Sequence, residues 1–133
     1  MSDELRVWIE SDSDIVTARH EGRTLAASLG FSAAELAFIA TAISELARNI
    51  VLYATRGEIR ISLIHSGRQR GIQVVASDEG PGIRDVRKAL NGGYSTSGGL
   101  GLGLPGVRRL MDETEVSSVE GKGTTIKARK WKL

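Results

Sequence analysis

Glycine is distributed very unevenly along this chain of 133 residues. Sixteen glycines occur in total, and nine of them fall between Gly80 and Gly106. Glycine destabilises helices and strands unless the backbone needs a positive φ angle or must approach another group closely. We therefore expect the chemistry of the protein to lie in this stretch.

Hydrophobic periodicity predicts helices on both sides of the glycine-rich stretch. The second helix has the clearest start, because Ser32 and Glu35 form a capping box and Phe31 and Leu36 occupy the staple positions. Gly30 follows the first helix as a stop signal, and Pro105 suits the first turn of the last helix. The predicted helices cover residues 15–29, 33–54 and 105–111, with a short additional helix over 85–90.

Alternating apolar residues predict five strands, which cover residues 5–9, 59–63, 72–76, 116–119 and 124–131. Polar, glycine-containing turns join the second strand to the third and the fourth to the fifth, so each pair is expected to be a hairpin. The resulting order predicts an α+β two-layer sandwich, with a mixed, mostly antiparallel sheet and helices on one face. Because no linker or repeat interrupts the chain, we expect a single domain over residues 1–133.

The composition excludes several classes of protein. Without cysteine, the chain cannot form disulfides, thiolate zinc sites or a cysteine nucleophile. The net charge of +2 is too small to indicate a nucleic-acid partner. No apolar run approaches the ~18 residues of a membrane span, and the acidic start Met1–Glu4 lacks the apolar core of a signal peptide. We therefore expect a cytoplasmic protein that binds neither nucleic acid nor membranes.

The segment Gly101–Gly106 matches the dinucleotide-binding pattern Gly-x-Gly-x-x-Gly. That interpretation fails because the preceding residues are polar and no βαβ unit follows. A glycine-rich loop that leads into a helix still offers free N–H groups to phosphate. No Lys or Arg lies between Lys88 and Arg108, so a bound phosphate would need these amides and a metal ion. The alternative is an ordinary surface loop.

Two further motifs combine polar side chains with a defined position in the fold. Asp78 follows a predicted strand and is followed by Gly80 and Gly82, so its carboxylate can accept a hydrogen bond from an exocyclic amine while the glycines admit a flat ring. Glu45 and Asn49 share one face of the second helix, and an amide oxygen is a ligand that Mg²⁺ accepts. The alternatives are an ordinary turn and a solvated pair at the edge of the apolar face.

In combination these motifs are more specific. Glu-x-x-x-Asn on a helix, Asp-x-Gly-x-Gly after a strand and Gly-x-Gly-x-Gly before a helix resemble the Bergerat-fold (GHKL) ATP-binding superfamily. The segment Gly121–Thr125 resembles the last motif of that superfamily, so the resemblance covers nearly the whole chain. Within the superfamily, the segments Ile43–Asn49 and Ser95–Val107 are similar to the anti-sigma-type serine/threonine kinases, and most of all to the switch kinases of stressosomes.

The resemblance implies a role for each matching residue. Asp78 would bind the adenine amine, Thr124 or Thr125 would support adenine through water, and Asn49 would hold Mg²⁺. Glu45 would be the general base toward a protein hydroxyl. The other residues assigned to ATP, with Gly82 behind the adenine and the later glycines around the phosphates, are Gly80, Gly82, Ile83, Gly99, Gly101, Leu102 and Gly103.

The function that the resemblance implies is phosphoryl transfer from ATP–Mg²⁺ to a serine or threonine of STAS-domain stressosome proteins, RsbS-like and RsbR-like. The kinase would then be released to activate an effector such as a phosphatase. The alternative is a nucleotide-dependent anti-sigma-type binding module, which would have no use for a base at Glu45. A gyrase-like or chaperone-like ATPase would need more chain than 133 residues. His20, within a segment similar to a histidine-kinase acceptor box, is interpreted as a surface residue.

Overall fold

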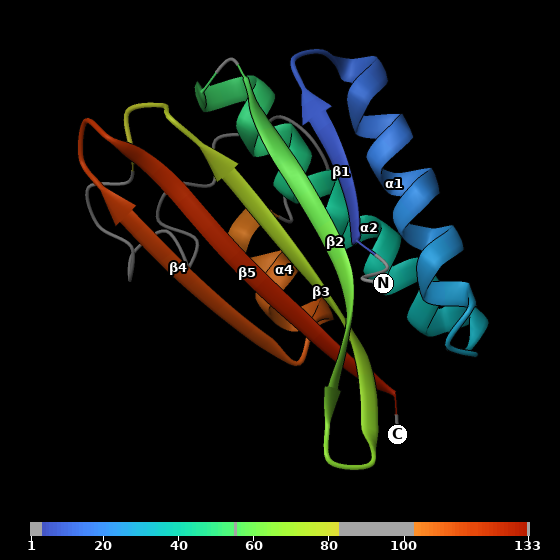
Figure 1. Cartoon of the computed structure of the whole chain (residues 1–133). Helices are drawn as coiled ribbons and strands as arrows, with labels where there is room; N and C mark the ends of the chain where they lie inside the picture. The colour runs from blue at the N-terminus through green and yellow to red at the C-terminus, as the bar shows by residue number, and fades with distance from the viewer. Residues whose placement is uncertain (1–3, 55, 83–102, 133) are drawn as a thin grey trace.

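The computed structural model describes residues 4–54, 56–82 and 103–132, which form a sheet with helices packed behind it (Figure 1). The sheet and the helices make two layers, as the order of the predicted elements indicated. The elements are β1 (Glu4–Ile9), α1 (Asp12–Ala27), α2 (Ala33–Asn49), the π-helix η1 (Ile50–Ala54), β2 (Gly57–Ser66), β3 (Gln69–Asp78), α4 (Gly103–Leu110), β4 (Glu113–Val119) and β5 (Gly123–Lys132).

The sheet has five strands in the order β1-β2-β3-β5-β4, and neighbouring strands pair in antiparallel fashion throughout. The expected α+β architecture is confirmed, and the parallel pairing that a mixed sheet would contain does not occur among the described strands. Hairpins account for two of these pairings, β2 with β3 and β4 with β5. The β2–β3 turn and the β4–β5 turn each return the chain beside the strand that it has just left.

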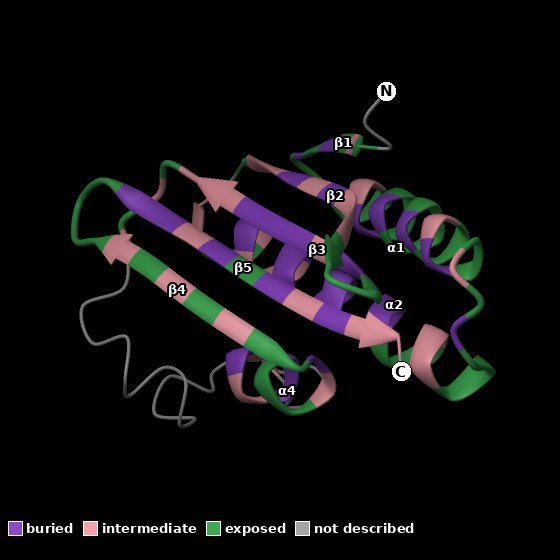
Figure 2. Ribbon diagram, turned by 60° about the horizontal axis from the view of Figure 1, so that its bottom comes forward, coloured by how far each residue is buried: buried purple, intermediate pink, exposed green. Residues whose placement is uncertain are grey.

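The core lies between the sheet and the helices (Figure 2). Alternate side chains of each strand point toward the helices, as the two-residue period of a strand requires. From the helical layer the largest fully buried side chains are Ile39, Ile43, Leu46, Ile50 and Val107, and from the sheet they are Ile9, Ile59, Ile61, Ile72 and Val74. Most of these helical side chains come from α2 and η1, so α2 is the central helix.

Local sequence signals explain where the two long helices begin and how they meet. At the start of α2, Glu35 N–H donates to Ser32 Oγ over 3.1 Å, and Ser32 N–H donates to Glu35 Oε1 over 3.0 Å. This capping box was predicted, and it satisfies two donors that the first turn leaves free. Gly22 in α1 faces Ile43 and Ile61, and a Cβ at this position would collide with both side chains. The absence of a side chain at Gly22 therefore lets α1 pack closely against both isoleucines.

The expectation that no apolar segment approaches the length of a membrane span was wrong. The segment Ala33–Ala54 is long and apolar enough to cross a membrane by length and composition, with a mean hydropathy of 1.4. Its apolar character has a structural reason, because α2 and η1 fill the centre of the core and bury side chains over much of their circumference. Glu45, Arg48 and Asn49 lie within the same segment.

Strand β4 begins earlier than the sequence predicted. It starts at Glu113 rather than Val116, because the charged residues of its first half pair with β5 on the open face of the sheet. Arg129 Nη1 lies 3.1 Å from Glu113 Oε1. Apolar alternation cannot detect a strand that is held by such cross-strand charge pairs. The short helix predicted over residues 85–90 lies outside the described residues.

Candidate functional site

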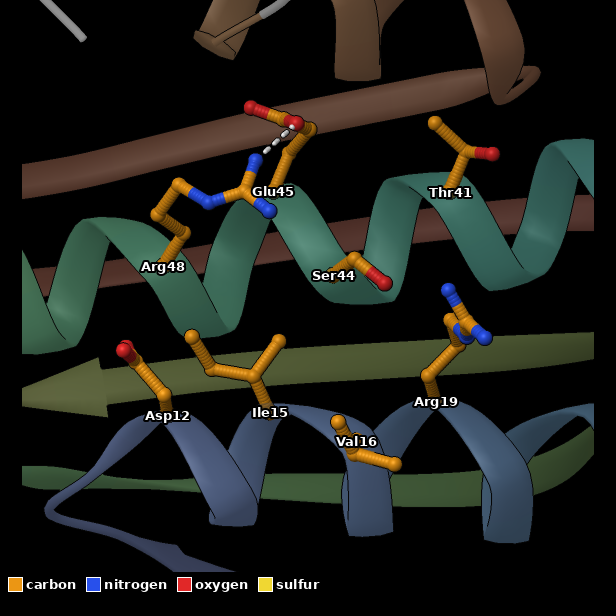
Figure 3. Close-up of a pocket in the computed structure, with 8 residues that line it drawn as sticks. All are labelled: Asp12, Ile15, Val16, Arg19, Thr41, Ser44, Glu45 and Arg48. Atoms are coloured by element: carbon orange, nitrogen blue, oxygen red, sulfur yellow. Dashed lines mark hydrogen bonds and ion pairs between the residues drawn. The ribbon is translucent and has the colours of Figure 1, made fainter. Parts of the chain in front are cut away.

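Glu45 is the most deeply buried acidic residue that the structure describes, with 4% of its surface exposed. Its carboxylate leaves α2 on the side away from α1 (Figure 3). Oε1 accepts a hydrogen bond of 2.7 Å from Arg48 Nη1, and Oε2 accepts one of 3.1 Å from the N–H of Gly103. A buried charge needs such partners. The side chain predicted to be a solvated edge residue or a base is therefore a buried, oriented carboxylate.

Asn49 is the last residue of α2, and it is half-buried. One turn separates it from Glu45, so both residues lie toward the same side of the helix. The π-helix η1 begins at the next residue. Such a change in helical pitch is often found at functional sites, because it re-aims the side chains at the junction. The amide of Asn49 can therefore serve a ligand that also approaches Glu45.

The end of β3 carries Asp78, whose side chain closes a tight turn. Its Oδ1 accepts a hydrogen bond of 2.9 Å from the N–H of Gly80. Among the described residues, Oδ2 of the same carboxylate has no hydrogen-bond donor. This arrangement orients the carboxylate through one oxygen and leaves the other for a ligand, as hydrogen bonding to an exocyclic amine requires.

The register of the sheet distinguishes between the two candidate threonines. Thr124 is the cross-strand partner of Asp78, whereas Thr125 pairs with Ser77. Successive residues of a strand point to opposite faces, so Thr124 shares the helix-covered face with Asp78 and Thr125 points to the open face. Ser118 Oγ lies 2.9 Å from Thr124 Oγ1. No sequence motif marks Ser118, and only its position opposite Thr124 in the sheet identifies it.

Close backbone contacts explain the glycines around Asp78. A Cβ on Gly80 would collide with Ala54, one on Gly82 with Val119, and one on Gly123 with the Asp78 carbonyl. Gly82 and Gly123 also have positive φ angles of 77° and 111°. The N–H of Gly121 donates to the carbonyl oxygen of Pro81 over 2.6 Å. These glycines hold the turn after β3 against η1 on one side and the β4–β5 turn on the other.

The structure thus brings the predicted motifs together through two contacts. Glu45 touches Gly103 at the start of α4, and Gly80 touches Ala54, five residues after Asn49. The second half of α2, the turn after β3 and the first residue of α4 consequently border one region of the molecule. The predicted site residues Ile83, Gly99, Gly101 and Leu102 lie outside the described residues. The N–H of Gly103, which was predicted to contact phosphate, donates a hydrogen bond to Glu45 in this structure.

A separate cavity of about 450 Å³ lies between α1 and α2 (Figure 3). Its lining residues are Asp12, Ile15, Val16, Arg19, Thr41, Ser44, Glu45 and Arg48. The cavity reaches the Glu45–Arg48 pair from the side of α1, but it contains neither Asp78 nor Thr124. It is therefore a second approach to Glu45 and not the space next to the turn after β3.

The part of the chain that the structure describes contains no cluster of three His, Cys, Asp or Glu side chains that could hold a metal ion by itself. A cation near Asn49 would thus need most of its ligands from water and from a bound phosphate, which is how Mg²⁺ usually binds with nucleotides. His20 is exposed on α1, in agreement with its interpretation as a surface residue.

Known proteins resemble this chain over nearly its full length. A family model described as the histidine kinase-like ATPase domain matches residues 10–130. The serine/threonine-protein kinase RsbT of Bacillus subtilis (strain 168) is 53% identical over 131 residues, which cover 98% of both chains. The anti-sigma F factor of Thermoanaerobacter sp. (strain X514) is 35% identical over 120 residues, or 86% of this chain and 82% of the relative. One of these relatives is thus named a kinase and the other an anti-sigma factor.

Proposed function

The chain belongs to the histidine kinase-like ATPase domain family, and on that premise we propose that it is a protein serine/threonine kinase that uses ATP with Mg²⁺. Its acceptors are STAS-domain proteins of a stressosome, of the RsbS-like and RsbR-like kinds. After transfer, the kinase is released and activates a downstream effector such as a phosphatase. It acts in the cytoplasm.

One observation carries this proposal more than any other. Glu45 is buried and ionically paired, and its second oxygen contacts the first residue of the helix that follows the glycine-rich stretch. Burial of a charge costs free energy, and a nucleotide-binding module without transfer has no need of a general base at this position. A role as general base beside the transferred phosphate would account for a carboxylate at this position.

The donor and acceptor groups fit an adenine nucleotide. Among the described residues, one carboxylate oxygen of Asp78 accepts no hydrogen bond and could take one from the adenine amine, and Thr124 with Ser118 offers hydroxyl groups on the same face. Asn49 supplies one neutral oxygen for the divalent cation. When bound, Mg²⁺ would neutralise phosphate charge, which matters because basic residues are absent between Lys88 and Arg108.

The proposed reaction uses these positions. The acceptor hydroxyl oxygen forms a bond to the γ-phosphorus while the bond from that phosphorus to the β–γ bridging oxygen breaks, and ADP leaves with the electron pair. Glu45 takes the proton from the attacking hydroxyl. Both carboxylate oxygens retain a lone pair for this proton, because each accepts only one hydrogen bond from the described residues.

The proposal is tested with γ-³²P-labelled ATP and a purified RsbS-like STAS-domain protein. We expect label on a serine or threonine of the STAS-domain protein, and we expect Glu45→Gln to lower the transfer rate by about 100-fold or more while ATP still binds. Nucleotide-dependent complex formation without any label on the partner would instead support the anti-sigma-type binding module, which the 35% identical anti-sigma F factor makes the second candidate.

A further inference from the structure

Arg48 is positioned to control the orientation of Glu45. It lies one turn after Glu45 on α2, and its Nη1 donates to Oε1 over 2.7 Å. The Arg48 side chain is 36% exposed, whereas the Glu45 side chain is 5% exposed. The guanidinium therefore brings its charge to a buried carboxylate from a position at the rim of the cavity between α1 and α2 (Figure 3).

Two donors from different elements fix the Glu45 carboxylate. Arg48 holds one oxygen from α2 itself, and Gly103 holds the other from α4. A glutamate side chain has several rotatable bonds, so a single hydrogen bond would still allow the carboxylate plane to turn. Charge-assisted bonds from an arginine are short and directional. Without Arg48, the backbone N–H of Gly103 is the one donor that remains among the described residues.

We propose that Arg48 is a positioning residue for phosphoryl transfer. It holds the Glu45 carboxylate in the orientation from which that carboxylate takes the proton of the acceptor hydroxyl, and it acts only through Glu45. The inference rests on the proposed kinase function and deepens it. A misplacement of about 1 Å in a catalytic group can cost about 100-fold in rate, so the loss of one of the two anchors should be visible in transfer.

The experiment compares wild type, Arg48→Met and Arg48→Lys in transfer of γ-³²P from saturating ATP to the RsbS-like STAS-domain protein. Met removes the charge but keeps an unbranched side chain, and Lys keeps the charge without the fork of donors. We expect Arg48→Met to be about 100-fold slower and Arg48→Lys to regain at least about tenfold. Titration calorimetry should give ATP dissociation constants within about twofold of wild type for both variants, because the proposal has Arg48 act on Glu45 and not on the nucleotide.

A second comparison separates positioning from a general structural role. In a Glu45→Gln background, Arg48→Met should cause no further loss of transfer beyond about twofold, since residues that act as a unit are not additive. This double variant also buries no unpaired charge, so it should fold even if Arg48→Met alone does not. Arg6→Ala is the matched control: it breaks an Arg–Glu pair of 3.1 Å on β1 and β2, and transfer should be unchanged.

The outcomes distinguish two kinds of failure. If wild type transfers label and Arg48→Met matches it, or if the whole effect of Arg48→Met is on ATP affinity, the inference is wrong and the kinase function stands. If Arg48→Met slows transfer by the same factor in the wild-type and the Glu45→Gln backgrounds, Arg48 does not act through Glu45 and the inference is also wrong. If wild type transfers no label to the STAS-domain protein, the proposed function and the inference both fail.

Discussion

The N–H of Gly103 donates a hydrogen bond of 3.1 Å to Oε2 of Glu45, a residue 58 positions earlier in the chain. The bond joins the first turn of α4 to the second half of α2. Because the first N–H groups of a helix have no partner within it, Glu45 acts as a cap for α4 as well as a candidate base. Substitution of Glu45 should therefore affect both stability and transfer.

Different substitutions of Glu45 should separate these two roles. Glu45→Gln keeps an oxygen acceptor for the Gly103 N–H but loses the one for Arg48, whose partly exposed guanidinium can turn to water, so we expect its free energy of unfolding to remain within about 1 kcal/mol of wild type. Glu45→Ala leaves that N–H unsatisfied and should cost about 2 kcal/mol. Both variants should lose transfer. Urea denaturation measures the stabilities, and equal stabilities for the two variants would show that the bond to Gly103 contributes little.

Asp78→Asn tests the adenine pocket. The substitution retains Oδ1 for the Gly80 N–H but replaces the other oxygen with a donor, which faces an amine instead of accepting from it. We expect ATP affinity to fall by at least about tenfold, because hydrogen bonds to charged groups contribute about 1.5–3 kcal/mol. Circular dichroism should show an unchanged fold. An unchanged dissociation constant in titration calorimetry would rule out this position for the adenine amine.

Thr124 and Thr125 form a matched pair for the same pocket. Thr124→Val removes the hydroxyl on the face shared with Asp78, and we expect ATP binding to weaken about fivefold. Thr125→Val makes the same chemical change on the open face and should leave the affinity unchanged. Fluorescence titration with a labelled ATP analogue measures both. A larger loss for Thr125→Val would mean that the adenine approaches from the other face.

Gly121 and Gly123 test the contact between the β4–β5 turn and the end of β3. Both have positive φ angles, 83° and 111°, so alanine at either position should cost about 1–2 kcal/mol from backbone strain. A Cβ on Gly121 meets open space, whereas one on Gly123 meets the Asp78 and Glu79 backbone. Gly123→Ala should therefore cost about 1–3 kcal/mol more and also weaken ATP binding. Equal unfolding midpoints in urea would contradict this.

Acid should destabilise the protein through three surface carboxylates. The N–H of Ser32 lowers the pKa of Glu35 from its usual 4.5, the N–H of Glu10 lowers that of Asp14, and the Trp131 indole lowers that of Glu113. A lowered folded-state pKa gives stability that is complete above the unfolded value and is lost as the pH falls through the folded value. The urea concentration at the midpoint of unfolding should therefore decrease as the pH falls below about 4.5.

A Glu35→Gln variant provides the control for this pH dependence. It lacks one of the three lowered carboxylates but keeps the oxygen that accepts the Ser32 N–H, so its urea midpoint should vary less between pH 5 and pH 3 than that of wild type. If the two proteins lose stability in parallel over this range, the capping carboxylate does not contribute to the acid sensitivity.

Local sequence signals predicted much of the fold. The capping box of Ser32 and Glu35 and both hairpins are confirmed, and so is the family resemblance. The early start of β4 was missed because its first residues are held by charge pairs with β5 instead of apolar alternation. The membrane-length hydropathy of Ala33–Ala54 was missed because scattered polar residues interrupt its apolar run.

The sequence by itself determined the types, order and approximate ends of the elements and the residue types able to bind ATP, because caps, periodicity and glycine spacing act over a few neighbouring residues. The tertiary structure alone decided that Thr124 and not Thr125 faces Asp78, that Ser118 joins them, and that Arg48 and Gly103 hold the two oxygens of Glu45. Register and helix packing bring together residues far apart in the chain, and no local pattern encodes which of their atoms meet.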